Sequence, residues 1–150
     1  MRRELSPEWI EPMARLVAAA ASVRDRAYAP YSGYLVGAAV LDAQGRTFCG
    51  VNVENISYGA TICAERGAVM HMVAEGGGPI VAVAVVTVDG GTPCGMCLQV
   101  LRELALDPES VWVGCADPAG LREVFRLADL MPASFASASV RRTPTDRSSS

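Results

Sequence analysis

The chain of 150 residues contains no lysine and a single histidine, so its positive charge rests on 13 arginines alone. Sixteen acidic residues outnumber these arginines, and the formal net charge at pH 7 is −3. Proteins that bind DNA or RNA as their main task usually carry a basic face, since the phosphate backbone dominates their affinity. The charge balance therefore argues against a nucleic-acid polymer as partner.

The sequence also lacks a long apolar run. No stretch approaches the ~20 apolar residues that a membrane-spanning helix needs. The first nine residues, MRRELSPEW, lack the apolar segment of a secretory signal. We therefore expect a cytoplasmic protein with no membrane partner. Hydrophobic residues nevertheless make up 51% of the chain, which is ample for the core of one domain of this length.

Cysteine is present in an odd number, five. In a reducing compartment a closely spaced cysteine pair more often binds a metal or undergoes redox chemistry than forms a structural disulfide. Cys94 and Cys97 form such a pair in the stretch PCGMCLQ. Taken alone, C-x-x-C allows three interpretations: a thioredoxin-like redox pair, half of a structural zinc site, or half of a catalytic zinc site.

Hydrophobic periodicity predicts an alternation of helices and strands. In order, it predicts a helix from residue 7 to about 27, a hairpin of 35–42 and 46–53, a helix within 62–78, a strand over 80–88, a helix over 94–106 and a strand over 111–116. Residues 121–132 fit either a strand that runs into a short helix or one continuous helix. The alternation indicates an α/β fold, a three-layer α/β/α sandwich around a mixed sheet of about five strands.

A third cysteine lies at another predicted helix start, in the stretch ICAER. A structural zinc site wants four protein ligands, whereas a catalytic site has three and keeps one position open. Cys63, Cys94 and Cys97 supply three. Cys49 and Cys115 lie in predicted strands, and we interpret them as small apolar core residues.

Glu65 separates the structural from the catalytic interpretation. It follows Cys63 by two positions, so near a helix start it reaches the same space without being a ligand. A carboxylate in that place can take a proton from an attacking water and return it to the substrate. The alternative is a first-turn glutamate that only stabilises the helix dipole. The pattern C-A-E followed by P-C-x-x-C favours catalysis, because zinc nucleobase deaminases combine such ligands with a non-ligand glutamate.

Three segments together carry a resemblance to a known family. They are YSGYLVGAAVLDAQGRTFCGVNVENISYGATICAERGAV, PCGMCLQVLREL and LMPASF. They closely resemble the small homotetrameric cytidine deaminases of the cytidine/deoxycytidylate deaminase superfamily, over roughly residues 13–135. The occurrence of NVEN, CAER and PCGxC in this order is highly specific.

The resemblance implies the activity and its setting. It implies zinc-dependent hydrolysis of cytidine or 2'-deoxycytidine to the uridine product and ammonia, in cytoplasmic pyrimidine salvage. It also implies a homotetramer. Small apolar residues of the helix after Cys63, such as Ala68, Val69 and Met72, could pack between its subunits. We expect residues 1–135 to form the catalytic domain. Residues 136–150 have no apolar pattern, and we expect them to be disordered.

The resemblance also implies roles at the metal centre. Cys63, Cys94 and Cys97 are expected to hold Zn²⁺, and Glu65 is expected to shuttle protons. Arg66 is expected beside the metal ligands, where its charge offsets that of the thiolates.

Five further residues match positions at which the family binds its substrate. The resemblance implies that Asn52 and Glu54 form hydrogen bonds to the ribose. It implies that the backbone around Ala64 contacts the pyrimidine and that Tyr34 lines the ring pocket. Phe135 is expected to reach into the site of a neighbouring subunit.

The sequence departs from the family at position 98, where Leu98 replaces a usual second arginine. Three thiolates leave a zinc site with a formal charge of −1, and a missing arginine predicts a more electron-rich, weaker Lewis acid. Arg102, one turn along the predicted helix, is a conceivable substitute. The alternative is that Leu98 simply packs.

A second departure is Tyr34, which stands where the family usually has phenylalanine. The added hydroxyl leaves open a deaminase of a modified cytosine nucleoside or of a nucleoside antibiotic such as blasticidin S. A catalytically impaired, zinc-stabilised paralogue is a further alternative. Intact Glu65, Asn52 and Glu54 argue against it, since a purely structural site has no use for a spare carboxylate.

Overall fold

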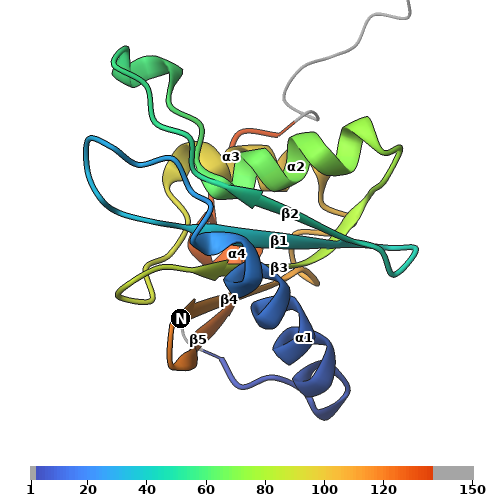
Figure 1. Ribbon diagram of the computed structural model, residues 1–150. Helices are drawn as coiled ribbons and strands as arrows, with labels where there is room; N and C mark the ends of the chain where they lie inside the picture. Colours follow the sequence, from blue (N-terminus) through green and yellow to red (C-terminus); the bar gives the residue numbers. More distant parts are fainter. Residues whose placement is uncertain (1–2, 137–150) are drawn as a thin grey trace, which may run out of the picture.

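A computed structural model describes residues 3–136 of the chain (Figure 1). The sequence predicts disorder for residues 136–150, and residues 137–150 lie outside the described range. The elements are α1 (Pro7–Arg24), β1 (Gly37–Asp42), β2 (Thr47–Val51), a 3-10 turn (Tyr58–Ala60), α2 (Ala64–Ala74), β3 (Ile80–Val86), α3 (Gly95–Leu104), β4 (Trp112–Asp117), β5 (Gly120–Arg126) and α4 (Leu127–Leu130).

The five strands form one mixed sheet in the order β2-β1-β3-β4-β5. Strands β3 and β4 are parallel, and every other neighbouring pair is antiparallel. The parallel pair is joined through α3, as a crossover connection requires. The structure thus confirms the predicted α/β class and number of strands. Of the two predictions for residues 121–132, the strand that runs into a short helix is correct.

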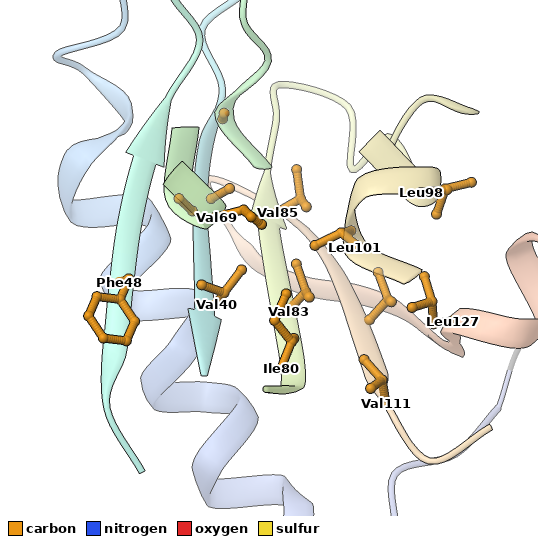
Figure 2. Packing of buried hydrophobic residues seen from close by; sticks show 14 of the residues in the cluster. Val40, Phe48, Val69, Ile80, Val83, Val85, Leu98, Leu101, Val111 and Leu127 are labelled. Carbon is orange, nitrogen blue, oxygen red and sulfur yellow. The ribbon is translucent and has the colours of Figure 1, made fainter. Parts of the chain in front are cut away.

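Helices cover both faces of the sheet. In Figure 1, α1 lies below the sheet, whereas α2 and α3 lie above it. Strand β3 is covered by helices on both faces, which explains why its sequence is apolar at every position. Ala82 and Ala84 pack with α1, and Val83 and Val85 pack with α2 and α3. Figure 2 shows this second face, with Val83 and Val85 beside Leu101 of α3. Within residues 3–136, no helix combines the length and apolar character needed to cross a bilayer.

Helix α1 ends earlier than the sequence predicts. Its first residue is Pro7, and Pro12 lies inside it without ending it. The helix ends at Arg24, not near residue 27. Beyond it, the NH of Tyr28 donates to the carbonyl of Asn52, and the NH of Glu54 donates to the carbonyl of Tyr28. The chain therefore leaves the helix to pair with the segment after β2. Helical spacing in the sequence cannot reveal such a long-range pairing.

Helix α2 approaches β2 so closely that only glycine fits between them. A Cβ on Gly50 would lie 2.2 Å from the backbone nitrogen of Ala68 and 2.4 Å from the carbonyl oxygen of Ala64. Real Cβ atoms do not make such contacts, so a larger residue at this position must displace the helix. Gly50 therefore fixes the N-terminal half of α2, which carries Glu65 and follows directly from Cys63.

We expect the substitution Gly50→Ala to destabilise the fold by about 1–3 kcal/mol, because one methyl group overpacks the contact between β2 and α2. Urea unfolding followed by circular dichroism measures this loss. The matched control is Gly59→Ala, since nothing lies within 4 Å of a Cβ built there. We expect the control to stay within about 0.5 kcal/mol of the unsubstituted chain. Equal stability of the two variants would show that α2 adjusts freely.

Candidate metal centre and the adjoining pocket

Two helix starts carry the three candidate metal ligands. Cys63 is the N-cap of α2 and Cys94 is the N-cap of α3, while Cys97 lies in the first turn of α3. Neither capping thiol forms a side-chain hydrogen bond to its own helix. Helices α2 and α3 pack on the same face of the sheet, so both positive dipole ends lie near the thiols. This arrangement favours thiolates over thiols.

The three sulfur atoms are close enough to share one ion. The Sγ atoms of Cys63, Cys94 and Cys97 all lie within 4.8 Å of one another. Those of Cys63 and Cys94 are 4.0 Å apart. Thiolates at about 2.3 Å from a tetrahedral zinc ion stand about 3.8 Å from each other, so the donor set fits zinc. A disulfide would need a separation near 2.05 Å, and all five cysteines are free.

The thiols cannot all ionise by themselves. The Cys97 thiol and the Arg66 guanidinium stabilise the Cys63 thiolate and lower its pKa. The contact with Cys63 raises the pKa of Cys97, and burial and the charge of Glu65 raise it further. The contact that favours a thiolate at Cys63 therefore disfavours a thiolate at Cys97. A divalent cation removes this conflict, because a thiol that coordinates a metal loses its proton.

Arg66 is the guanidinium group beside the sulfur cluster. Its Nη2 lies 3.7 Å from Sγ of Cys63 and donates to the carbonyl oxygen of Thr61 at 3.2 Å. Its buried Nε has no partner among residues 3–136. Leu98, by contrast, is 8% exposed and belongs to the apolar cluster between the sheet and α2 and α3 (Figure 2). Leu98 therefore packs, as the second of the two interpretations expects.

Glu65 lies in the first turn of α2 and is 5% exposed. Burial raises the pKa of its carboxyl group, and the negative charge of Cys63 raises it further. A buried carboxyl next to thiols is poised to hold a proton, which a first-turn glutamate facing water would not do. The position is therefore suited to acid–base chemistry.

A hollow of about 190 Å³ opens beside Glu65 and the sulfur cluster. It brings together most of the residues that the sequence proposes for substrate and metal. Its lining comprises Tyr34, Val36, Asn52, Thr61, Cys63, Ala64, Glu65, Val85, Thr87, Thr92 and Cys94. A pocket with a few polar groups and perturbed carboxyl and thiol groups at its base is the usual form of an active site.

Two proposed substrate residues lie outside this hollow. Glu54 lines a neighbouring depression, and it accepts hydrogen bonds from the backbone NH groups of Tyr31 and Ser32 and from the Ser32 hydroxyl. Phe135 is 63% exposed and lies beside the end of α3, where its carbonyl accepts a hydrogen bond from Gln99. Within one chain, neither residue lines the hollow beside the sulfur cluster.

Sequence reasoning missed the polar residues of the loop after β3. Thr87 lines the hollow and is 4% exposed, and its hydroxyl donates to Asp89. The available signal was the stretch TVDGGTP, in which polar residues follow directly on a buried strand. Arg102, the conceivable substitute for an arginine at position 98, lines the depression beside Phe135 instead.

The two remaining cysteines behave as the sequence predicts. Cys115 is fully buried in β4, and burial raises the pKa of its thiol to about 12. Cys49 is half-buried in β2 and lies against α1. Neither belongs to the sulfur cluster.

Known proteins share both the fold and this site region. The family model for the cytidine and deoxycytidylate deaminase zinc-binding region matches residues 10–115. A cytidine deaminase from Halalkalibacterium halodurans is 40% identical over 122 residues, which are 80% of this chain and 91% of that protein. The crystal structure of cytidine deaminase from Burkholderia pseudomallei superposes with a TM-score of 0.73 at 42% identity, covering 81% of this chain and 97% of the other. That from Mycobacterium tuberculosis gives a TM-score of 0.70 at 40% identity, covering 81% and 95%.

We expect Cys94→Ala to reduce the zinc content from about one ion per chain to below about a tenth, because two thiolates hold zinc far less tightly than three. Cys94 is exposed, so its truncation should leave the fold intact. Elemental analysis after dialysis against a chelator measures the metal.

The control for this experiment is Cys49→Ala, a cysteine outside the cluster. It should retain as much zinc as the unsubstituted chain. A full complement of zinc in Cys94→Ala would exclude this thiol as a ligand.

Proposed function

The chain belongs to the cytidine and deoxycytidylate deaminase family and is a zinc-dependent hydrolase that deaminates cytidine, and we propose which of its residues perform each part of this reaction. The overall reaction converts cytidine and water to uridine and ammonia. One observation supports the assignment of roles: a buried glutamate lies beside three clustered thiols, and it lines one hollow together with two of them, Cys63 and Cys94.

We assign Cys63, Cys94 and Cys97 as the zinc ligands. Zinc bound there supplies a Lewis acid that makes water nucleophilic near neutral pH. The three thiols come from two helix starts, so the protein holds them in place without depending on a flexible loop. Arg66 offsets part of their negative charge from its position beside Cys63.

Glu65 moves the protons. Its carboxylate accepts a proton from the water that attacks C4 of the cytosine ring. The same group delivers this proton to ring N3. It then takes the second proton, from the hydroxyl group now on C4, and gives it to the amine, which departs as ammonia while the C4 oxygen becomes the carbonyl of uridine. The raised pKa of Glu65 matches this double task, because a general acid–base group works best with a pKa near the operating pH.

The polar groups around the hollow orient the nucleoside. Asn52 uses its Oδ1 to accept from the NH of Val36 and its Nδ2 to donate to the carbonyl of Tyr34. An amide has two N–H groups, so one hydrogen of Asn52 remains for the ribose. Glu54 keeps part of its acceptor capacity beyond its three bonds to the backbone and hydroxyl groups of Tyr31 and Ser32. We assign both residues to the sugar, and Tyr34 and the backbone of Ala64 to the ring.

The substrate is the free nucleoside. Three carboxyl groups, those of Glu54, Glu65 and Asp89, lie in or beside the hollow. The Arg66 guanidinium is held by Cys63 and Thr61. A 5'-phosphate would therefore meet negative charge with no free cation facing it among these residues. We propose that cytidine and 2'-deoxycytidine are accepted and that their monophosphates are not.

We further propose a setting for this activity. Residues 1–135 form the catalytic domain, and the enzyme serves pyrimidine salvage in the cytoplasm. It works as a homotetramer, in which Phe135 of one chain contributes to the site of a neighbour. Two observations support this role: Phe135 is highly exposed, and it does not line the hollow of its own chain.

The outer face of α2 is a candidate subunit interface. Met70 and Val73 are 56% and 54% exposed on this helix. The residues expected from the sequence in this place, Ala68, Val69 and Met72, are instead buried in the core of the chain, and that expectation is wrong. Large apolar side chains exposed together on one surface commonly mark an interaction site.

We expect Glu65→Gln to keep its zinc while kcat falls by ~10²–10⁴-fold, the usual contribution of a positioned acid–base group. Loss of absorbance near 280 nm on incubation with cytidine measures the rate, and elemental analysis measures the metal. The control is Glu75→Gln at the other end of α2, which should deaminate cytidine normally. Near-normal turnover by zinc-replete Glu65→Gln would remove the catalytic assignment.

We expect light scattering of the purified chain to give about four times the 15.8 kDa chain mass. The double substitution Met70→Glu with Val73→Glu should shift the protein to smaller species, because it buries charge at the interface. Ile10→Glu serves as control, since Ile10 is equally exposed but lies on α1. A fully active monomer would overturn the tetramer.

A further inference from the structure

The hydroxyl group of Tyr34 is bound by the protein itself. Tyr34 lines the hollow from the loop before β1, and its Oη donates to Oδ1 of Asp89 at 2.5 Å. Asp89 belongs to the loop after β3 and lies 55 positions away in the sequence. One hydrogen bond therefore joins two loops that border the hollow.

Contacts within the loop that carries Asp89 hold its carboxylate in place for this bond. The Thr87 hydroxyl donates to the same Oδ1 at 2.9 Å, and the NH of Gly91 donates to the Thr87 hydroxyl at 2.7 Å. A Cβ on Gly91 would lie 3.3 Å from Oη of Tyr34 and 3.4 Å from Oδ1 of Asp89. Gly90 has a φ of 72°, which favours glycine. The turn thus places its carboxylate directly on the tyrosine hydroxyl.

Tyr34 is also held through its backbone. Its NH donates to the Ser32 hydroxyl at 3.0 Å, and its carbonyl accepts from Nδ2 of Asn52 at 2.8 Å. The side chain is 37% exposed, so packing alone would leave the ring some freedom. The bond to Asp89 therefore restrains the ring at the wall of the hollow.

We propose that Tyr34 and Asp89 form a clamp that determines which cytosine nucleosides the enzyme accepts. Tyr34 is the specificity-determining residue, because it forms the wall that the substrate meets. Asp89 is a positioning residue that acts through Tyr34 and touches no substrate itself. The inference rests on the proposed function, since it concerns the substrate of the same site. A phenylalanine at position 34 would leave this wall without its tether and the hollow open to larger groups.

The test compares Tyr34→Phe, Asp89→Ala and the double variant. kcat and KM are measured for cytidine and for cytidines that carry one extra substituent at ring carbon 5 or on a sugar oxygen. The bond joins two protein groups, so cytidine is affected only through the displaced Tyr34 ring, and the roughly ten-fold in binding that one hydrogen bond to a charged group represents is an upper limit. We therefore expect KM for cytidine to rise by about five- to ten-fold in either single variant, with kcat within about two-fold. The preference of kcat/KM for cytidine over the larger nucleosides should fall by at least about five-fold.

The double variant distinguishes a clamp from two independent residues. If the two side chains act only through their mutual bond, the double variant should behave as either single variant does. Additive losses would overturn the clamp. Asp89→Asn keeps an acceptor oxygen for Tyr34, so it should restore KM to within about three-fold of the original value. If Asp89→Ala does not fold, Asp89→Leu replaces it in the comparison, because leucine is close in size and offers Tyr34 no acceptor.

Two measurements complete the test. Tyr28→Phe removes a hydroxyl from a more exposed tyrosine and should change neither KM nor the preference among nucleosides. Zinc content should stay at about one ion per chain in every variant, because Asp89 is not a ligand. An unchanged preference in Tyr34→Phe, with normal turnover of cytidine, would overturn the clamp alone. No turnover of any cytosine nucleoside by the unsubstituted chain would instead overturn the proposed function and the clamp with it.

Discussion

The close meeting of two helix starts is the constraint on which the site depends. Helices α2 and α3 lie on one face of the sheet, and each begins at a cysteine. The thiols and the positive ends of both helices therefore share one small volume, in which negative charge is favoured but three negative charges repel one another. A divalent cation satisfies both conditions. Gly50 contributes at a distance, because it lets α2 lie directly on β2.

The sequence predicts the fold well where the signals are local. The apolar run of β3 and the helical spacing after Cys63 and Cys94 lead to elements that the structure confirms. The predicted end of α1 is too late because Tyr28 pairs with a segment 25 positions further along, at Val53. For residues 121–132 the sequence could not distinguish a strand from a helix, because the strand forms through its pairing with β4.

The site, too, is predictable only where its residues belong to local patterns. Cys63, Glu65, Cys94 and Cys97 are recognised from two short patterns, and the structure brings all four together. The Tyr34–Asp89 bond is not predictable, because it joins residues in two loops with no common pattern. From the sequence, the added hydroxyl of Tyr34 left open a modified nucleoside as substrate. The structure shows that this hydroxyl donates to a carboxylate of the protein, that of Asp89.

The central claim concerns the metal and its sulfur ligands, and X-ray absorption at the zinc edge tests it most directly. The account predicts three sulfur atoms at about 2.3 Å from the ion and one lighter atom at about 2.0 Å, the pattern of an open catalytic site. Four sulfur atoms would indicate a closed structural centre. A shell of nitrogen and oxygen alone would show that the ion binds elsewhere, and either result would contradict the account.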